Sequence, residues 1–314
     1  MLLSRTAANL FWLARYVERA ENTARILDAA SRLSSLPSGY GGTSNEWESA
    51  VIATGGHDLF RELYPDASAT NVIDFLGFSA QNPSSIRSCL EAARRNARAV
   101  RTALTIEMWE AINGAWLEQR RFDAARMNRQ QLNTFLTFVR EASLRFDGSA
   151  YRTMLRTDAY SFFRLGVYVE RGDCTARILD VKYHVLLPEG GRVGGGVDYF
   201  QWSAILRSVS ALNAYHWVYR TSLQPWLVAD LLILRPEMPR SIVSCYENIA
   251  RFLEQLGEEY GRQGPSQRTA RAIYANLQNL SIDDIFKKGL HEFLVETIAE
   301  NNRLGARITE QYLI

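Results

Sequence analysis

Acidic and basic residues recur at one helical spacing in two similar stretches of the chain. Residues 16–28 read YVERAENTARILD and residues 168–180 read YVERGDCTARILD, with ten of the thirteen positions identical. Residues three, four and seven positions apart share one face of a helix, so Glu18 and Arg25 fall on one stripe, which the second stretch repeats. A carboxylate beside an arginine stays ionised, and this favours the binding of charged groups over general acid–base catalysis.

The charged residues of both stretches stand among apolar neighbours such as Leu10, Phe11 and Val17. A helix that is apolar on nearly all sides is usually buried, and a buried charge must be paired, because removal of one partner costs about 3–5 kcal/mol. Two interpretations stay open: an ion-pair lattice that fixes the register of two central helices, or a site that binds a charged ligand or a partner segment. The candidate binding residues are Glu18, Arg19, Asn22, Arg25, Glu170, Arg171 and Arg177.

A second basic cluster has no counterpart in the other half of the chain. Arg94, Arg98 and Arg101 fall on one face of an expected helix, and guanidinium groups bind phosphate and carboxylate oxygens in pairs. These three arginines are therefore further candidate binding residues. The alternative is a solvated helix face whose arginines pair with Glu91 and Glu107. No exposed aromatic residues are interleaved with the arginines, which argues against nucleic acid as the ligand.

No motif indicates catalysis or a metal site. The four histidines are scattered, and none completes the Glu-x-x-His pair of a di-metal bundle. The glycines of residues 190–196 are not followed by the Gly-Lys-Ser/Thr of a phosphate-binding loop. Cys89 and Cys245 occupy equivalent positions, which is typical of small core residues rather than nucleophiles. We therefore assign no catalytic residue, no metal ligand and no cofactor.

The similarity between the two halves of the chain extends beyond the charged stretches. Residues 83–91 read PSSIRSCLE and match residues 239–247, which read PRSIVSCYE. Each half also contains a glycine-rich loop, at residues 36–42 and 187–196. Self-similarity of this kind indicates a duplicated structural unit, whose copies bury their apolar faces against each other.

The spacing of apolar residues predicts helices and no strands. Residues 84–116 carry apolar side chains at helical intervals, and Ser85 and Ser241 stand beside prolines as plausible N-caps. We expect an all-α fold of ten or more helices in a single domain over residues 1–314. This multi-helix bundle would be built from two tandem repeats, at about 1–150 and 151–314, related by a pseudo-two-fold axis.

The composition of the chain indicates which kinds of partner to expect and which cellular compartment the protein occupies. A formal net charge of +2 gives no general attraction to nucleic acid or to acidic lipid. The longest apolar run, residues 225–234, contains Asp230 and is too short to span a membrane. Three cysteines are too few for a disulfide framework, which favours a cytoplasmic protein. The oligomeric state stays open.

Taken together, these segments resemble the Alpha-E family, a group of predicted all-helical bacterial proteins named for a Glu-Arg motif. The motif falls on Glu18-Arg19 and Glu170-Arg171, and the resemblance covers essentially the whole chain. It implies a link, through gene neighbourhood and fusion, to a circularly permuted ATP-grasp protein and often to a transglutaminase-like protein. ATP-grasp enzymes activate a carboxylate as an acyl phosphate and transfer it to an amine. The resemblance supplies no catalytic residue.

The leading hypothesis is a non-catalytic helical partner of an ATP-grasp peptide or amide ligase. Such a partner would hold a substrate, or a segment of the ligase, against the central glutamates and arginines. One alternative is a stand-alone enzyme that transfers or hydrolyses an amide, although no nucleophile–base pair is evident beside the carboxylates. The other alternative is a purely structural scaffold, in which the charges only fix the helix register.

Overall fold

The computed structural model describes residues 2–35, 46–184 and 196–314, and in these ranges all regular structure is helical. The predicted all-α class is therefore confirmed. Of the predicted glycine-rich loops, residues 36–42 and 187–195 lie outside the described ranges. The α-helices are α1 (Ser4–Leu33), α2 (Glu46–Ala53), α3 (His57–Leu63), α4 (Ala69–Gly77), α5 (Ile86–Ala99), α6 (Ile106–Gln119), α7 (Arg129–Thr153), α8 (Asp158–His184), α9 (Gly196–Ser208), α10 (Leu212–Tyr219), α11 (Pro225–Ile233), α12 (Ile242–Glu259), α13 (Pro265–Asn279), α14 (Ile282–Lys288) and α15 (Leu290–Ile308).

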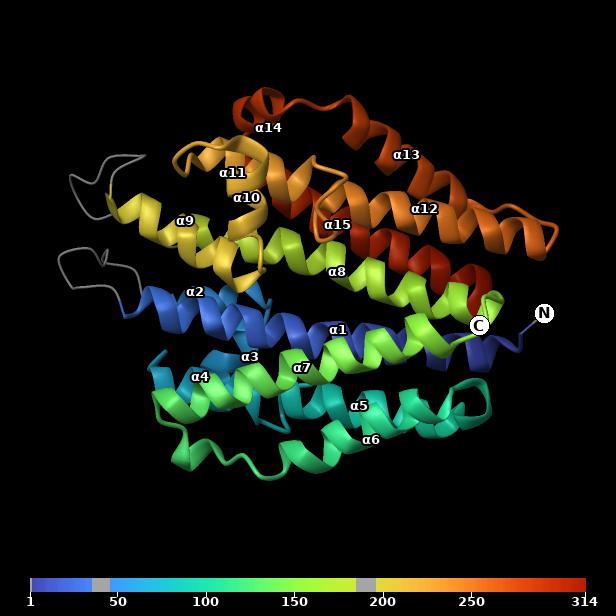
Figure 1. The fold of residues 1–314 in the computed structure, drawn as a ribbon, viewed down its shortest axis with the longest axis horizontal. Helices are drawn as coiled ribbons and strands as arrows, with labels where there is room; N and C mark the ends of the chain where they lie inside the picture. Colours follow the sequence, from blue (N-terminus) through green and yellow to red (C-terminus); the bar gives the residue numbers. More distant parts are fainter. Residues whose placement is uncertain (1, 36–45, 185–195) are drawn as a thin grey trace.

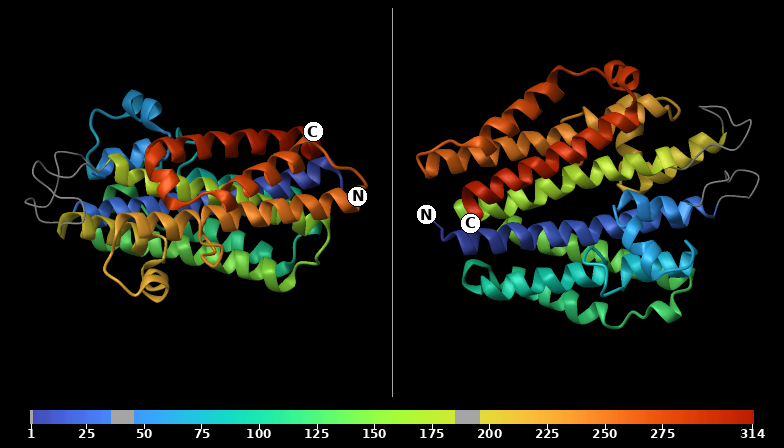
Figure 2. Two further views of the ribbon diagram at one scale, coloured as in Figure 1. Left: turned by 90° about the horizontal axis from the view of Figure 1, so that it is seen from above. Right: turned by 180° about the vertical axis from the view of Figure 1, so that it is seen from behind.

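Helices α1 and α8 run side by side along the long axis of the molecule (Figure 1). Helices α5, α6 and α7 lie on the α1 side of this pair, and α12, α13 and α15 lie on the α8 side, as the view from behind also shows (Figure 2). Helix α1 packs against α5, α7 and α9, whereas α8 packs against α12, α15 and α2. Each charged stretch therefore lies on one of the two central helices.

The sequence of α1 explains its length and its central position. The helix runs for 30 residues without a glycine or proline, so nothing in it removes a backbone hydrogen bond. Its buried residues include Leu10, Phe11, Leu13 and Ile26, and they lie on most sides of the helix. Such burial is possible only because other helices surround α1.

In the described part of the chain, no helix is long and apolar enough to cross a membrane.

Helices α5 and α12 begin in the same way. The side chain of Ser85 accepts a hydrogen bond from the backbone N–H of Ser88, and that of Ser241 accepts one from Ser244. These contacts confirm both predicted N-caps. The expected helical segment 84–116 is wrong in one respect, because α5 ends at Ala99 and α6 begins only at Ile106. The interruption has a local cause: the Thr105 side chain caps the start of α6.

The central helices approach each other most closely at Gly166 of α8. A methyl group at this position would overlap the backbone carbonyl oxygen of Phe11 on α1. Gly172, one and a half turns further along α8, has more room, because a methyl group there would lie 3.4 Å from the side chain of Cys245. The absence of a side chain at Gly166 therefore sets the separation of α1 and α8.

We expect Gly166→Ala to destabilise the protein by about 2 kcal/mol or more, because the new methyl group forces the central helices apart. Gly172→Ala is the matched control on the same helix. It should be neutral, or stabilising by about 0.5–1 kcal/mol, because alanine is the better helix former. Urea unfolding of both variants measures the difference. Equal stabilities for the two variants would contradict the close approach at Gly166.

Candidate functional site

The Glu-Arg pairs of α1 and α8 face each other across the helix interface. Glu18 accepts hydrogen bonds from Arg171, one of them from Nε at 3.3 Å. Glu170 accepts from Arg19 in the reverse direction, with Nε–Oε1 at 2.6 Å and Nη2–Oε2 at 3.0 Å. Glu18 is 3% exposed and Glu170 is 2% exposed. Each buried carboxylate is therefore paired with the arginine that follows the other carboxylate in the sequence.

Each of these glutamates has a second arginine. Arg15 donates from Nε to Glu170 at 2.7 Å, and Arg240 lies 3.8 Å from Glu18. Arg240 lies just before the start of α12, so a third segment of the chain contributes to the centre besides α1 and α8. Sequence analysis did not propose Arg15 or Arg240 as site residues. One feature of the sequence distinguishes Arg240: in the alignment of residues 83–91 with 239–247, it is an arginine where the first segment has Ser84.

Further ion pairs extend the network along both helices. Arg25 donates to Glu21 one turn before it, with Nε–Oε1 at 2.9 Å, and Arg177 donates to Asp173 at 2.6 Å. In both pairs the acid precedes the arginine by four residues, which is the favoured order on a helix. We call the whole set the Glu/Arg centre. It comprises Arg15, Glu18, Arg19, Glu21, Arg25, Glu170, Arg171, Asp173, Arg177 and Arg240.

The outer arginines of the centre also bind backbone carbonyl groups. Arg25 donates from Nη1 to the carbonyl oxygen of Ser208 at the end of α9, at 2.5 Å. Arg177 donates to that of Ala53 at the end of α2, at 3.1 Å. The last carbonyl groups of a helix have no partner within it, and a cation there also interacts favourably with the helix dipole. The two arginines therefore fix the ends of α9 and α2 to the central helices.

The electrostatics of the carboxylates differ between the two sides of the centre. Burial alone would raise the pKa of Glu170, but Arg15 and Arg19 outweigh it and lower the pKa to about 2. Burial is likewise outweighed at Glu21, where Arg240 and Arg25 lower the pKa to about 2. At Asp173, which corresponds to Glu21, burial raises the pKa and Arg177 offsets it only in part. Asp173 is thus the least stabilised anion of these three.

A polar cavity of about 190 Å³ lies beside Glu170 and Asp173. Within the described residues, two buried oxygens on its lining residues have no hydrogen-bond partner, Oδ1 of Asn22 and Oδ1 of Asp173. Both oxygens are fully buried, so they lie behind the surface of the cavity and not on it. The cavity is lined by Arg15, Arg19, Asn22, Thr23, Thr54, Ser84, Glu170, Asp173, Cys174, Arg177 and Asn302.

The cysteine thiols near the centre are held neutral. All three cysteines are free and buried. Burial raises the pKa of Cys89 to about 12, against the opposing effect of Arg19, and raises that of Cys245 to about 12. Burial also raises the pKa of Cys174 well above its ordinary value. Because the thiolate is the reactive form, these residues behave as core side chains.

The second predicted cluster does not form one arginine face. Arg94 and Arg98 lie on α5, but Arg101 lies beyond its end. Arg94 stacks on the Trp116 ring at 4.0 Å and donates to Asn113, and Arg101 lies over Trp109 at 5.0 Å. Arg98 is exposed. The two tryptophans under these arginines are half-buried.

The tryptophans beneath Arg94 and Arg101 belong to α6, which packs on α5. A contact between two helices is not visible in the spacing of α5 alone. The expected pairing with Glu91 and Glu107 is also wrong, because in the described part of the chain neither glutamate forms an ion pair with these arginines. The cluster is separate from the Glu/Arg centre and shares no residue with its cavity.

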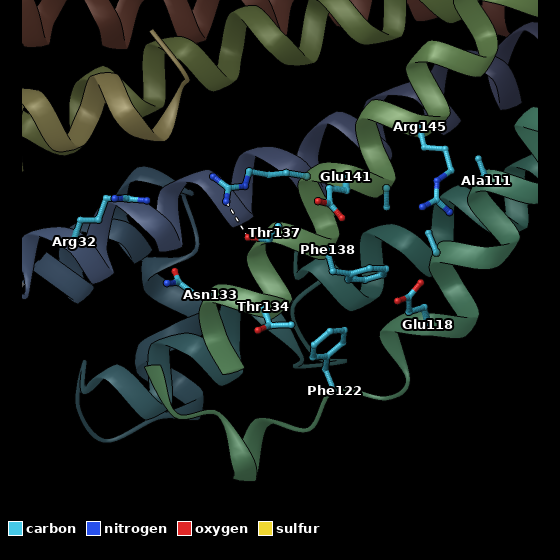
Figure 3. Close-up of a pocket in the computed structure, with 13 residues that line it drawn as sticks. Arg32, Ala111, Glu118, Phe122, Asn133, Thr134, Thr137, Phe138, Glu141 and Arg145 are labelled. Carbon is cyan, nitrogen blue, oxygen red and sulfur yellow. Dashed lines mark hydrogen bonds between the residues drawn. The ribbon is translucent and has the colours of Figure 1, made fainter. Parts of the chain in front are cut away.

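Sequence analysis also missed a larger groove between α6 and α7 (Figure 3). This groove has a volume of about 520 Å³, and none of the predicted site residues lines it. Figure 3 shows Phe122 and Phe138 beside Glu118, with Arg145 and Glu141 further along. Its charges are mixed and lie near the surface.

In the described residues, no group of three or more His, Cys, Asp or Glu side chains could hold a metal ion.

Removal of one partner from the centre tests the importance of its pairing. We expect Arg171→Met to destabilise the protein by about 3–5 kcal/mol, because it leaves the buried Glu18 with Arg240 alone. The double variant Glu18→Leu/Arg171→Met should lose less than the sum of its single variants, and urea unfolding measures this coupling. The exposed pair Glu254–Arg271 is the control, and its coupling should not exceed about 1 kcal/mol.

Acid should weaken the centre over a defined range of pH. The pKa of Glu170 is about 2 in the folded protein and about 4.5 when the group is unperturbed. Its ionised form therefore stabilises the fold above pH 4.5, and this contribution, on the order of 3 kcal/mol, is lost as the pH falls toward 2. Glu170→Gln should flatten the dependence of unfolding free energy on pH in this window. Glu254→Gln, at the exposed pair with Arg271, is the control variant.

Comparison with known proteins identifies the family to which these residues belong. The family model of Alpha-E, described as a predicted alpha-helical domain with a conserved ER motif, matches residues 2–313. No curated protein and no solved structure matches the chain. The match covers nearly the whole sequence, and the all-helical fold agrees with its description. The chain belongs to the Alpha-E family.

Proposed function

We propose that the protein is a non-catalytic helical partner of a circularly permuted ATP-grasp peptide or amide ligase. In this role it binds part of the substrate, or a segment of the ligase, at the Glu/Arg centre. The main supporting observation is the polar cavity beside Glu170 and Asp173, which three arginines of the centre, Arg15, Arg19 and Arg177, also line. The ligase itself is taken from the family resemblance, which implies a link between Alpha-E proteins and ATP-grasp proteins. A transglutaminase-like protein is the second partner in this proposal.

The proposal also includes the internal duplication, with repeats at about 1–150 and 151–314 around a pseudo-two-fold axis. Reciprocal contacts support it: Glu18 pairs with Arg171 as Glu170 pairs with Arg19. An equivalent contact also occurs within each half. Tyr64 donates to Asp74, and Tyr219 donates to Asp230, with 155 residues between the tyrosines and 156 between the aspartates. Duplication would place two equivalent half-sites at the α1–α8 interface.

The state of the ionisable groups favours binding over chemistry. A carboxylate with a pKa near 2, such as Glu170, is a weak base at neutral pH. The buried thiols are neutral, as described above, and this also agrees with a reducing cytoplasm. Guanidinium groups held in place by carboxylates are well suited to recognise charged ligands, because their geometry is fixed in advance.

A structural scaffold is the competing function, and one observation favours it. On the side of Arg240, Glu18 and Glu21 bind side chains of the protein itself. Arg240 pairs with both glutamates, and Ser143 donates a hydrogen bond to Glu21 at 2.6 Å. This half of the centre stabilises the α1–α8 register without any ligand. The cavity lies on the other side, beside Glu170. We therefore assign the structural role to the Glu18 side of the centre and the binding role to the Glu170 side.

Co-purification with the cognate ATP-grasp protein tests the proposed partnership. We expect the two proteins to elute together at micromolar concentration and the ligase activity to fall when this protein is omitted. Asn22→Ala removes a polar group from the cavity, so it should retain co-elution but reduce ligase activity. Asn9→Ala, on the same helix but outside the Glu/Arg centre, is the control and should retain both.

Clean separation of the two proteins, together with unchanged ligase activity in the absence of this protein, would contradict the partnership. If the proteins elute together but Asn22→Ala behaves like Asn9→Ala, the partner binds elsewhere on the surface and the cavity has no part in the ligase reaction.

A further inference from the structure

The arginines beside Glu170 have hydrogen-bond donors that the described residues do not use. Arg15 donates to Glu170 from Nε, and neither of its two Nη atoms has a partner there. Arg19 uses Nε and Nη2, and Arg177 uses Nε and Nη1, so one Nη atom of each has no partner in the described ranges. An arginine side chain has donors only and cannot accept a hydrogen bond. These Nη atoms are therefore available to an acceptor from outside the protein.

The free Nη atoms are accessible, unlike the unpaired oxygens of Asn22 and Asp173. In the described part of the chain, no arginine nitrogen is among the fully buried side-chain atoms that lack a hydrogen-bond partner. Each free Nη atom therefore exposes part of its surface. Arg15, Arg19 and Arg177 all line the polar cavity of about 190 Å³. An acceptor held in this cavity can therefore meet more than one of them.

The guanidinium group of Arg15 is held in place before any ligand binds. Its Nε donates to Glu170 at 2.7 Å, and its carbon Cζ lies 4.8 Å from the centre of the Trp12 ring. The two Nη atoms of one guanidinium group match the two oxygens of a carboxylate, with which they form parallel hydrogen bonds. Because the side chain is already ordered, binding a carboxylate costs little conformational entropy.

The charges around the cavity favour an anion with a single charge. Three arginines and two carboxylates line it, and one positive charge is in excess when all five groups are ionised. The arginine side chains are 12–25% exposed, and the carboxylate side chains are 3–10% exposed. Charge so far removed from water requires a partner of opposite sign. A monoanion balances the excess, whereas a dianion such as phosphate would add negative charge beside Glu170 and Asp173.

The remaining walls of the cavity are polar and leave room for a short carbon chain. Thr54, Ser84 and Asn302 line it, and Asn302 on α15 is exposed, so this side of the cavity opens to solvent. The volume of about 190 Å³ exceeds the roughly 30 Å³ that one water molecule occupies in the liquid. A carboxylate with a few carbon atoms attached therefore fits, and a longer ligand can extend past Asn302.

We propose that this cavity is a carboxylate-binding site. Arg15 binds both carboxylate oxygens through its Nη atoms, and Arg19 and Arg177 stabilise the charge. The inference rests on the proposed function in one respect, that the Glu/Arg centre is a binding site, and it adds the class of ligand. A carboxylate held there suits a ligase that activates carboxylates. The carboxylate belongs either to a free small acid or to an acidic residue of a peptide, and the choice of probes separates these sources.

Isothermal titration calorimetry on the isolated full-length protein, at constant ionic strength, tests this inference. The probes are acetate, propionate, butyrate and glutamate blocked at both ends, each compared with the amide of the same shape. We expect at least one carboxylate to bind with 1:1 stoichiometry and its amide to give no binding. Binding of a simple acid indicates a free small acid as the ligand, and binding of blocked glutamate alone indicates an acidic residue. Inorganic phosphate should bind more weakly than the best carboxylate.

Two variants place the binding in the cavity. Arg15→Lys keeps a positive charge beside Glu170 but loses the paired Nη donors, so it should raise the Kd about tenfold or more. Asn302→Asp adds a negative charge at the exposed side of the cavity without a change of size. It should raise the Kd roughly three- to tenfold. Asn279→Asp, at an exposed position of α13 that does not line the cavity, is the control and should keep the wild-type Kd.

Four results would overturn the inference: no binding of any of the four carboxylates, an amide that binds as tightly as its carboxylate, phosphate that binds more tightly than every carboxylate, or wild-type affinity in Asn302→Asp or in a folded Arg15→Lys protein. The measurement needs no ligase, so its outcome is separate from the proposed function. Co-elution with the ATP-grasp protein without carboxylate binding would overturn only the ligand. Carboxylate binding without co-elution would overturn only the partnership.

Discussion

The reciprocal pairing of Glu18 with Arg171 and of Glu170 with Arg19 is the interaction on which the rest of the structure depends. These ions lie between the two longest central helices, where both carboxylates are buried, and an unpaired ion there would cost several kcal/mol. A shift of α1 along α8 by one turn would break both pairs together. Apolar packing alone tolerates such a shift much more readily, because hydrophobic contacts are not directional. The charges therefore select one register, and Gly166 allows the helices to come close enough for the pairs to form.

Once the register of α1 and α8 is fixed, the other helices have defined positions. Arg25 and Arg177 bind the last carbonyl groups of α9 and α2, and Arg240 connects the start of α12 to Glu18 and Glu21. The charged centre thus holds helices from both halves of the chain. The two sides of the centre are not equivalent. Glu18 has its second arginine, Arg240, from the start of α12, whereas Glu170 has its second arginine, Arg15, from α1. The cavity lies beside Glu170.

The sequence predicted the features that depend on local pattern. Helical class, the caps at Ser85 and Ser241 and the buried glutamates all follow from periodicity and residue type, and the structure has them. The partners of the charges could not be predicted in this way. Spacing placed Glu18 with Arg25 on one stripe, whereas Glu18 pairs with Arg171 on another helix. Arg240 was missed for the same reason, since its contact with Glu21 joins residues more than two hundred positions apart. Likewise, the stacking of Arg94 on Trp116 depends on how α6 packs against α5.

The pairing that stabilises the centre also limits its chemistry. Glu21 and Glu170 are surrounded by arginines that lower their pKa to about 2, so neither accepts a proton readily at neutral pH. Asp173 is different, because its pKa is raised by burial and one of its oxygens has no partner. Glu21 receives hydrogen bonds from Arg25, Arg240 and Ser143, whereas Asp173 receives one from Arg177. The number of donors that reach each carboxylate, and not its burial alone, therefore sets how firmly the centre holds its negative charge.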